Sequence, residues 1–391
     1  MPKRVVTSVL VLLAFALSAG GVYALIRTGE IPDIRAELSV SDALSAGSVE
    51  GFARAVETRA FSFPDDHGPH PEYKIEWWYY TGNLDSTEGR HFGFQLTFFR
   101  IAITPEPAER ESAWAASNVY TAHFALTDVE GNRFYSFERF SRYGLRLAGA
   151  EAQPFRVWLE SWSAEGSEGD TFPMRLQVAE GEIAIDLTLE SAKPLVLQGD
   201  GGLSQKSAGA GNASYYYSMT RLLTSGTVRI GEKSFEVSGV SWMDREWSST
   251  ALSDEQVGWD WFALQLSDGR EIMFYQLRIR DGSIDPFSAG TLINADGSTQ
   301  ALSLDDVQIE VLDTWKSGID GTAYPSRWRV RIPSASLDLE VTPYIKNQEM
   351  DVSVRYWEGA VRIRGTSDGE PISGNGYVEL TGYNDARSGR S

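Results

Sequence analysis

The sequence predicts an all-β protein built from antiparallel sheets. Short segments in which apolar and polar residues alternate recur from residue 61 onward, as in strands with one buried face. Clusters of turn-forming residues separate these segments, and no long stretch after residue 60 has a helical period or a strand–helix alternation. The clearest strands are 90–100, 118–127 and 181–189, and the clearest turns are 128–132, 163–170, 268–269 and 296–297.

Length and composition bound the class of protein. A chain of 391 residues with 42% hydrophobic residues can bury two cores, which favours two domains. The 54 acidic residues outnumber the 35 basic ones, for a net charge of -19, so the chain lacks the basic footprint that nucleic-acid binding needs. We therefore expect no nucleic-acid partner.

The N-terminal segment 1–26 predicts export. Lys3 and Arg4 precede an uncharged apolar run, and small residues near Ala24 suit cleavage by a signal peptidase. The run is nearly long enough to span a bilayer, so an uncleaved membrane anchor is the alternative. Both interpretations place the body outside the cytoplasm, with membrane contact only through this segment. Residues 27–60 are then a polar linker with a short helix near 41–44.

The strand 74–84 contains Glu-Trp-Trp-Tyr-Tyr and is aromatic on both faces. Because side chains alternate along a strand, Trp77 and Tyr79 point one way. Glu76, Trp78 and Tyr80 point the other way, and we predict that these three line a ligand site. Both faces should be covered by protein or line a cavity.

The block 240–248 carries the candidate catalytic residues. Alternation places Trp242, Asp244 and Glu246 on one face, with Arg245 on the other. A carboxyl group desolvated by tryptophan has a raised pKa and can donate a proton at neutral pH. We therefore predict Asp244 and Glu246 as general acids. In the alternative interpretation, these carboxylates form structural ion pairs inside a barrel.

Further candidate ligand-binding residues follow on other strands. The segment 258–265 aligns Trp259, Trp261 and Gln265 on one face, as expected for a mostly apolar pocket with a few polar groups. A tryptophan-rich core is the alternative. The remaining candidates, which lie on predicted strands, are Gln95, His123, Trp242 and Tyr275.

Neither a metal nor a cofactor is predicted. The chain has four histidines and no cysteine, and His67 and His70 lack the helical spacing that brings two imidazoles together. No Gly-x-Ser-x-Gly nucleophile motif occurs. The glycine-rich segment 199–214 lacks the Gly-Lys-Ser ending of a phosphate-binding loop, so we predict a mobile loop at a barrel mouth.

An internal similarity supports two domains of related build. Residues 78–96 resemble 261–277 in the order of their aromatic, Gly-Arg and Gln-Leu positions. We place the boundary near residue 250, which gives an N-terminal domain at 61–250 and a C-terminal domain at 251–391.

Several sequence blocks resemble the AttH/carotenoid 1,2-hydratase family between residues 61 and 383. The blocks are His70-x5-Glu76-Trp-Trp-Tyr79-x-Thr-Gly82, Trp242-Met-Asp-Arg-Glu-Trp-Ser248, Gly258-Trp-Asp-Trp261, Asp268-Gly-Arg270 and Gly376-Tyr-Val-Glu-Leu-Thr-Gly382. The resemblance implies two lipocalin-like antiparallel β-barrels packed together. Members include carotenoid hydratases, fungal pericyclases and exported bacterial proteins linked to ABC-transporter permeases. Carotenoid hydratases carry a histidine beside the central aspartate, where this chain has Arg245.

Three functional hypotheses follow from these residues and this resemblance. The leading one is an exported protein that binds a small apolar ligand, isoprenoid or lipid-like. The second is a cofactor-free hydratase or isomerase of terpenoid alkenes that uses Asp244 or Glu246 as general acid. The third is an accessory subunit of an envelope ABC transporter.

Overall fold

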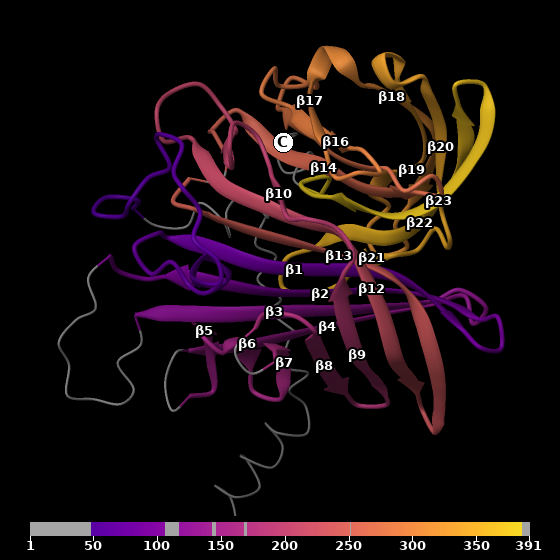
Figure 1. Cartoon of the computed structure of the whole chain (residues 1–391), viewed down its shortest axis with the longest axis horizontal. Helices are drawn as coiled ribbons and strands as arrows, with labels where there is room; N and C mark the ends of the chain where they lie inside the picture. The colour runs from indigo at the N-terminus through magenta and orange to yellow at the C-terminus, as the bar shows by residue number, and fades with distance from the viewer. Residues whose placement is uncertain (1–47, 106–116, 143–145, 168–169, 251, 385–391) are drawn as a thin grey trace, which may run out of the picture. The chain divides into compact units, whose positions relative to one another are not determined.

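The computed structural model describes residues 48–105, 117–142, 146–167, 170–250 and 252–384. These residues form a nearly all-β structure of two antiparallel sheets, as predicted (Figure 1). The predicted signal or anchor segment and the helix near residue 41 lie outside the described residues. None of the helices within the described ranges has the length and hydrophobicity of a membrane span.

The N-terminal sheet contains thirteen strands of the described chain, with the order β4-β3-β2-β1-β13-β12-β9-β8-β7-β6-β5 and with β10 and β11 paired to β12. A short 3-10 helix, η1 (Asp65–His67), precedes it. The strands are β1 (Ile75–Ser86), β2 (His91–Ala102), β3 (Asn118–Asp128), β4 (Arg133–Arg142), β5 (Ala148–Ala152), β6 (Phe155–Leu159), β7 (Trp162–Gly166), β8 (Met174–Glu180), β9 (Ile183–Ser191), β10 (Val196–Leu197), β11 (Leu203–Gln205), β12 (Ala213–Ile230) and β13 (Lys233–Ser248).

The C-terminal sheet contains ten strands of the described chain, with the order β17-β16-β15-β14-β23-β22-β20-β19-β18 and with β21 paired to β22. Two short 3-10 helices, η2 (Leu304–Asp306) and η3 (Pro333–Ala335), interrupt it. The strands are β14 (Gln256–Leu266), β15 (Glu271–Ile279), β16 (Ala289–Ile293), β17 (Thr299–Ser303), β18 (Gln308–Lys316), β19 (Ala323–Ile332), β20 (Leu337–Pro343), β21 (Glu349–Met350), β22 (Tyr356–Ser367) and β23 (Glu370–Leu380).

The two sheets share a topology but differ in closure. Each begins with a hairpin, β1–β2 or β14–β15, and pairs its first strand with its last, β13 or β23. This correspondence includes the two segments whose sequences resemble each other. The C-terminal strands curl into a nearly closed barrel, whereas the N-terminal sheet is a half-barrel (Figure 1).

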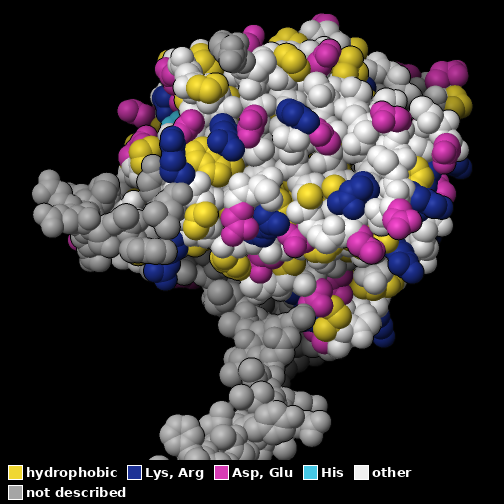
Figure 2. Space-filling view, turned by 90° about the horizontal axis from the view of Figure 1, so that it is seen from below, with side chains coloured by type: hydrophobic (Ala, Val, Ile, Leu, Met, Phe, Trp, Pro, Cys, Tyr) yellow, Lys and Arg dark blue, Asp and Glu magenta, His cyan; other side chains and the backbone are white. Residues whose placement is uncertain are grey.

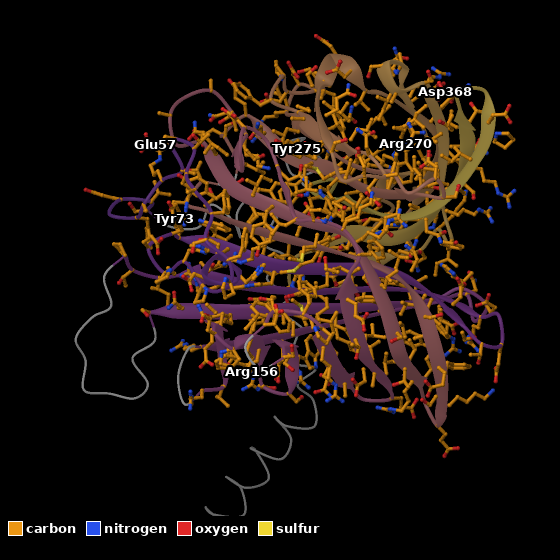
Figure 3. The ribbon with its side chains drawn as sticks, viewed as in Figure 1. Glu57, Tyr73, Arg156, Arg270, Tyr275 and Asp368 are labelled. Atoms are coloured by element: carbon orange, nitrogen blue, oxygen red, sulfur yellow. The ribbon has the colours of Figure 1, made fainter. Side chains whose placement is uncertain are left out.

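Each sheet wraps around its own hydrophobic core, and a third cluster lies between the sheets. The third cluster contains Tyr79 and Trp242 from the N-terminal sheet and Trp261 and Tyr377 from the C-terminal sheet. At Gly93 on β2, a Cβ atom would lie 2.4 Å from the Cβ of Ala360 on β22, so a glycine is required for this close approach. Side chains fill the space inside both sheets (Figure 3).

Strand β1 separates the N-terminal core from the contact between the sheets. Trp78 and Tyr80 lie in the N-terminal core, whereas Tyr79 packs in the cluster between the sheets with Trp77 against it. The two faces of the aromatic strand are therefore both covered, as alternation predicts. Its direct neighbour on one side is β13, with Tyr79 opposite Asp244.

Most of the predicted turns occur where expected. Gly269 and Gly297 close hairpins with φ of +85° and +86°, a conformation that glycine adopts without a steric penalty. The turn predicted at 163–170 is wrong in its first part, because strand β7 continues to Gly166. The segment 199–214 is not a plain loop, because it contains β11 and the start of β12.

A buried ion cluster joins β1, β2 and β13 on the side of β1 that faces away from the second sheet. The Glu76 carboxylate accepts hydrogen bonds from Arg100, from Arg245 and, at 3.0 Å, from the backbone N–H of His70. Burial alone would raise the pKa of Glu76, but the two guanidinium groups outweigh burial and lower it. The Arg245 guanidinium also lies 4.0 Å from the centroid of the Trp78 ring.

The face shown in Figure 2 carries acidic and basic side chains that are interspersed, with hydrophobic side chains scattered among them. Exposed cross-strand ion pairs elsewhere in the chain follow the same pattern, such as Arg175 with Asp186 and Arg156 with Glu165. Such pairs contribute little to stability because water screens them.

We predict that Glu76→Gln destabilises the fold by about 3–5 kcal/mol, because it leaves two buried guanidinium groups without a counter-charge. Denaturant unfolding followed by tryptophan emission measures this loss. Glu165→Gln, which breaks an exposed pair, is the control and should cost less than about 1 kcal/mol. Equal losses in the two variants would contradict the structural role of Glu76.

Candidate functional site

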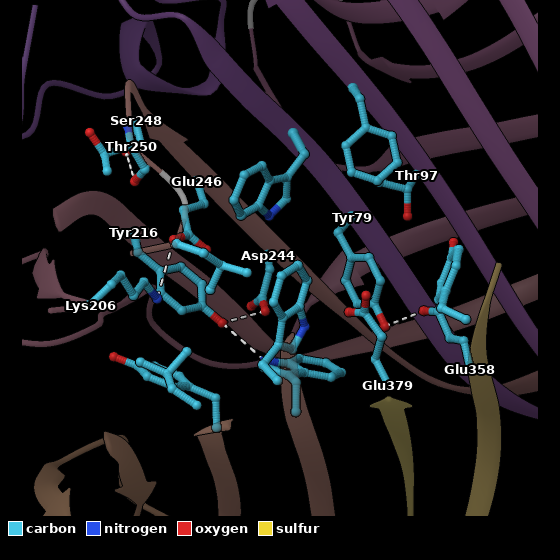
Figure 4. Close-up of a pocket in the computed structure, with 18 residues that line it drawn as sticks. Tyr79, Thr97, Lys206, Tyr216, Asp244, Glu246, Ser248, Thr250, Glu358 and Glu379 are labelled. Carbon is cyan, nitrogen blue, oxygen red and sulfur yellow. Dashed lines mark hydrogen bonds and ion pairs between the residues drawn. The ribbon is translucent and has the colours of Figure 1, made fainter. Parts of the chain in front are cut away.

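A partly open cavity lies between the two sheets, and its walls are aromatic and acidic (Figure 4). Its volume is about 100 Å³, on the scale of the roughly 150 Å³ engineered apolar cavity that binds benzene. The aromatic residues on its wall are Trp77, Tyr79, Phe99, Tyr216, Trp259, Trp261, Tyr275 and Tyr356. The acidic residues on its wall are Asp244, Glu246, Glu358 and Glu379.

The walls of the cavity are rows of directly opposed residues on neighbouring strands. One row crosses β2, β1, β13 and β12 and contains Phe99, Trp77, Glu246 and Tyr216. The next row along the same strands contains Thr97, Tyr79, Asp244 and Ser218. The facing row crosses β15, β14, β23 and β22 and contains Tyr275, Trp261, Glu379 and Glu358. Because opposed residues share a face, each sheet presents a continuous wall.

Asp244 is the most constrained carboxyl group of the cavity. Its Oδ1 accepts hydrogen bonds from Ser218 Oγ at 2.5 Å and Trp242 Nε1 at 2.6 Å, and its Oδ2 accepts one from the Tyr216 hydroxyl. The side chain is only 4% exposed, and this desolvation raises its pKa to about 7 even though the three donors oppose the rise. Asp244 is therefore a fixed carboxyl group that exchanges its proton near neutral pH.

Glu246 lies two residues further along β13 and pairs with Lys206, whose Nζ is 3.3 Å from its Oε1. The Lys206 ammonium lies 4.0 Å from the ring centroid of Tyr275 and 5.1 Å from that of Tyr216. Burial would lower the pKa of Lys206, but the charge of Glu246 outweighs it and raises the pKa. The segment before β12 thus places the charged ammonium group of Lys206 on the cavity wall.

Glu358 and Glu379 are directly opposed on β22 and β23. Glu358 is fully buried, and the Tyr79 hydroxyl donates a hydrogen bond to its Oε1. Burial, and secondly the charge of Glu379, raise the pKa of Glu358 well above its ordinary value. Burial also raises the pKa of Glu379 to about 8. These two groups hold protons at neutral pH.

A polar chain lies behind Tyr356 and links the two sheets. The Tyr356 hydroxyl is 2.8 Å from His123 Nδ1, and His123 Nε2 is 3.0 Å from Glu138 Oε1. Ser353 also donates to Glu138, at 2.5 Å. His123 therefore supports a wall residue of the cavity and does not itself line the cavity.

The sequence-predicted site residues divide into two groups. Five of them lie on the cavity wall: Asp244, Glu246, Trp259, Trp261 and Tyr275. The other seven do not: Glu76, Trp78, Tyr80, Gln95, His123, Trp242 and Gln265. Figure 3 labels Tyr275, which projects from β15.

The predicted site residues that do not line the cavity pack in the core, form ion pairs or make hydrogen bonds elsewhere in the protein. Trp78 and Tyr80 belong to the N-terminal core, and Glu76 belongs to the ion cluster, so the face of β1 that was predicted to bind a ligand points away from this cavity. Two glutamines, one on β2 and one on β14, make polar contacts inside the protein. Gln95 donates to Thr97 Oγ1 at 2.5 Å, and Gln265 donates to the Thr220 carbonyl at 2.7 Å.

The sequence prediction missed several wall residues. Trp77 and Tyr79 could have been found, because alternation already separated them from Glu76. Glu379 lies within the last block of the family resemblance, but nothing in the sequence places it opposite Glu358. Lys206 lies in the glycine-rich segment, where its ion pair with Glu246 depends on the fold.

By the resemblance noted in the sequence, Arg245 stands where a carotenoid hydratase would carry a histidine. Its side chain lies on the face of β13 that points away from the cavity, where it pairs with Glu76. This difference therefore leaves the cavity wall unchanged. Within the ranges that the structure describes, no group of three or more His, Asp or Glu side chains is arranged to hold a metal ion.

The fold and the cavity define a protein of two lipocalin-like sheets with a buried acidic site between them. The sequence profile of the AttH-like family matches residues 54–383, and the chain belongs to this family. No curated protein sequence matches the chain.

Solved structures show the same fold. A protein assigned as an AttH, from Nitrosomonas europaea, shares 35% identity with a TM-score of 0.75, and the match covers 85% of this chain and 100% of that one. Kievitone hydratase from Nectria haematococca shares 16% identity with a TM-score of 0.64, and the match covers 85% and 99% of the two chains. At that identity the second likeness speaks for the fold alone.

We predict that the free energy of unfolding falls as pH rises from about 6.5 to 8.5. Asp244 and Glu379 have folded pKa values of about 7 and about 8, above the ordinary 3.8 and 4.5. A raised carboxyl pKa stabilises the fold at low pH, and this contribution is lost as pH rises through the folded value. His67, whose pKa burial lowers to about 4, has the opposite effect but only below pH 6.5.

Denaturant unfolding at several pH values measures this slope, which has a limit of about 1.4 kcal/mol per pH unit for each retained proton. Glu379→Gln should flatten it. Asp186→Asn is the control, because the Arg175 hydrogen bond lowers the pKa of Asp186 and its effect belongs to acidic pH. A free energy of unfolding that stays flat between pH 6.5 and 8.5 would show that the cavity acids are already ionised in the folded protein.

Proposed function

We propose that this protein is a cofactor-free hydratase that adds water to a carbon–carbon double bond of a small apolar, isoprenoid-like ligand. The observation that carries the proposal is Asp244, a buried carboxyl group with a pKa of about 7 on the wall of an aromatic cavity. Such a group can both donate and accept a proton at neutral pH.

The reaction needs two proton transfers and no other reactant than water. The Asp244 carboxylic acid gives its proton to one alkene carbon, so a C–H bond forms and the electron pair of the double bond is used. The other carbon becomes cationic and water adds to it. The added water then loses one proton to the Asp244 carboxylate, which restores the acid and leaves an alcohol.

The cavity is suited to the cationic intermediate of this reaction. The faces of Trp259 and Trp261 and the other wall aromatics present negative charge density to a cation. Ionised Asp244 lies on the facing sheet of the cavity, and its three hydrogen-bond donors hold it in place before the reaction. Kievitone hydratase, which shares the fold, is a hydratase by name, so this fold has a precedent for a hydratase.

A second candidate function is a carrier that binds an apolar ligand without turnover. It is favoured by the number of aromatic side chains on the cavity wall. Export, and association with an ABC-transporter permease, remain part of either proposal as predictions from the sequence and the resemblance. Gene neighbourhood separates the two contexts, since carotenoid genes favour the hydratase and permease genes favour transport.

We predict that Asp244→Asn lowers hydration of an acyclic terpenoid alkene at least ~100-fold and preserves ligand binding. Asparagine keeps the acceptor for Ser218 and Trp242, and the Tyr216 hydroxyl can turn from donor to acceptor. Product formation measures turnover, and quenching of tryptophan emission measures binding. In wild type the rate should fall as pH rises through about 7, because the acid must be protonated.

Asp260→Asn is the matched control. Asp260 is also a buried aspartate with a raised pKa, but it pairs with Arg278 and Tyr383 and does not line the cavity. The Asp260→Asn variant should hydrate the terpenoid alkene at a rate within about threefold of wild type. Removal of a positioned acid, in contrast, lowers the rate by at least ~100-fold. Wild type that binds terpenoids tightly without any turnover would refute the hydratase and leave the carrier.

A further inference from the structure

The cavity between the sheets contains more acidic groups than its cation can neutralise. Among the described residues on its wall, Lys206 is the one cation, and it pairs with Glu246. Asp244, Glu358 and Glu379 have no cationic partner on that wall. Buried carboxyl groups are normally paired with a cation or remain neutral, so these three groups can all be ionised only if a cationic ligand compensates them.

Glu358 provides a second and independent observation. It is fully buried, and its Oε1 atom accepts the hydrogen bond from Tyr79. Its Oε2 atom has no hydrogen-bond partner within ordinary geometry, although the nearby Tyr356 hydroxyl also interacts with this carboxyl group and opposes the rise in its pKa that burial causes. Glu358 lines the cavity, so a group that enters the cavity can approach this incompletely hydrogen-bonded carboxyl group. Figure 4 shows Glu358 and Glu379 on one side of the cavity, with Lys206 on the opposite side.

The aromatic wall already holds one ammonium group. Lys206 Nζ lies over the rings of Tyr275 and Tyr216 at one side of the cavity. The rings of Tyr79 and Trp261, whose centroids are 5.2 Å apart, lie on the wall with Glu358 and Glu379. Aromatic rings beside carboxylates are the usual recognition site for quaternary ammonium groups.

From this geometry we infer that the cavity binds hydrophobic organic cations, tertiary or quaternary amines with an apolar body, with the ammonium beside Glu358 and Glu379 and the body against the tryptophans. The inference rests on the cavity and not on the proposed reaction, and it holds for a carrier as well as for a hydratase. It also makes such cations inhibitors of any alkene hydration, since they resemble the cationic intermediate.

Binding of the cation should release protons. Glu358 and Glu379 hold protons at neutral pH in the free protein, and a permanent positive charge nearby favours their ionised forms. The titratable groups around them are the carboxyls Asp244 and Glu246, the ammonium of Lys206 and the hydroxyls of Tyr79, Tyr216, Tyr275, Tyr356 and Tyr377, with His123 and Glu138 behind Tyr356.

The test uses purified full-length protein at pH 7 and two probes of equal shape, benzyltrimethylammonium and its neutral carbon analogue neopentylbenzene. Tryptophan quenching should give at least tenfold tighter binding of the cation. Calorimetry in two buffers of different ionisation enthalpy should show release of at least half a proton per bound cation. Equal affinities, or no proton release, would overturn the inference.

Variants connect the result to the named carboxyls. Glu358→Gln keeps the Oε1 acceptor for Tyr79, and it should remove most of the preference for the cation and leave the affinity of neopentylbenzene unchanged. Glu349→Gln is the matched control, because Glu349 is buried and hydrogen-bonded to Ser317 and Tyr324 outside the cavity. An unchanged preference in folded Glu358→Gln would overturn the inference. Terpenoid hydration, assayed separately, tests the proposed reaction independently.

Discussion

The pairing of β1 with β13 is the constraint on which the rest of the structure depends. On one face of this pair Glu76 and Arg245 form a fully buried ion pair, and on the other face Tyr79 lies opposite Asp244. A slip of one residue would turn every side chain to the opposite face. Such a slip would bury Asp244 in the N-terminal core and place Arg245 in the cavity. The ion pair between Glu76 and Arg245 therefore fixes the strand register that places Asp244 on the cavity wall.

The strand register also explains why the pKa values of the carboxyl groups in the cavity are raised. Rows of opposed residues place Glu379 opposite both Trp261 and Glu358. Like charges directly opposite each other are unfavourable, so burial and proximity together keep protons on this pair. Asp244 titrates near neutral pH because its hydrogen-bond donors offset much of the cost of burial. The site therefore contains carboxyl groups of graded acidity, which acid–base chemistry requires.

Local sequence patterns could predict the strands and their faces. Alternation correctly grouped Asp244 with Glu246 and separated Trp77 from Trp78, because both properties depend on one strand alone. Which face meets the cavity depends on the second sheet, and for β1 it is the face opposite to the one that the sequence analysis favoured. Glu358 and Glu379 lie opposite each other on the neighbouring strands β22 and β23, and they line a cavity that forms only where the two sheets meet. No residue spacing in the sequence predicts either the pairing or the cavity.

The cavity between the sheets holds carboxylic acids that stay protonated at neutral pH, and the proposed chemistry depends on this property. Infrared spectroscopy detects the carbonyl stretch of a neutral carboxylic acid separately from that of a carboxylate. At pH 7 the wild-type protein should show neutral-acid absorption that Glu379→Gln and Glu358→Gln each reduce and that alkaline titration removes. A spectrum at pH 7 with carboxylate absorption alone, unchanged in its neutral-acid region by both variants, would contradict the account.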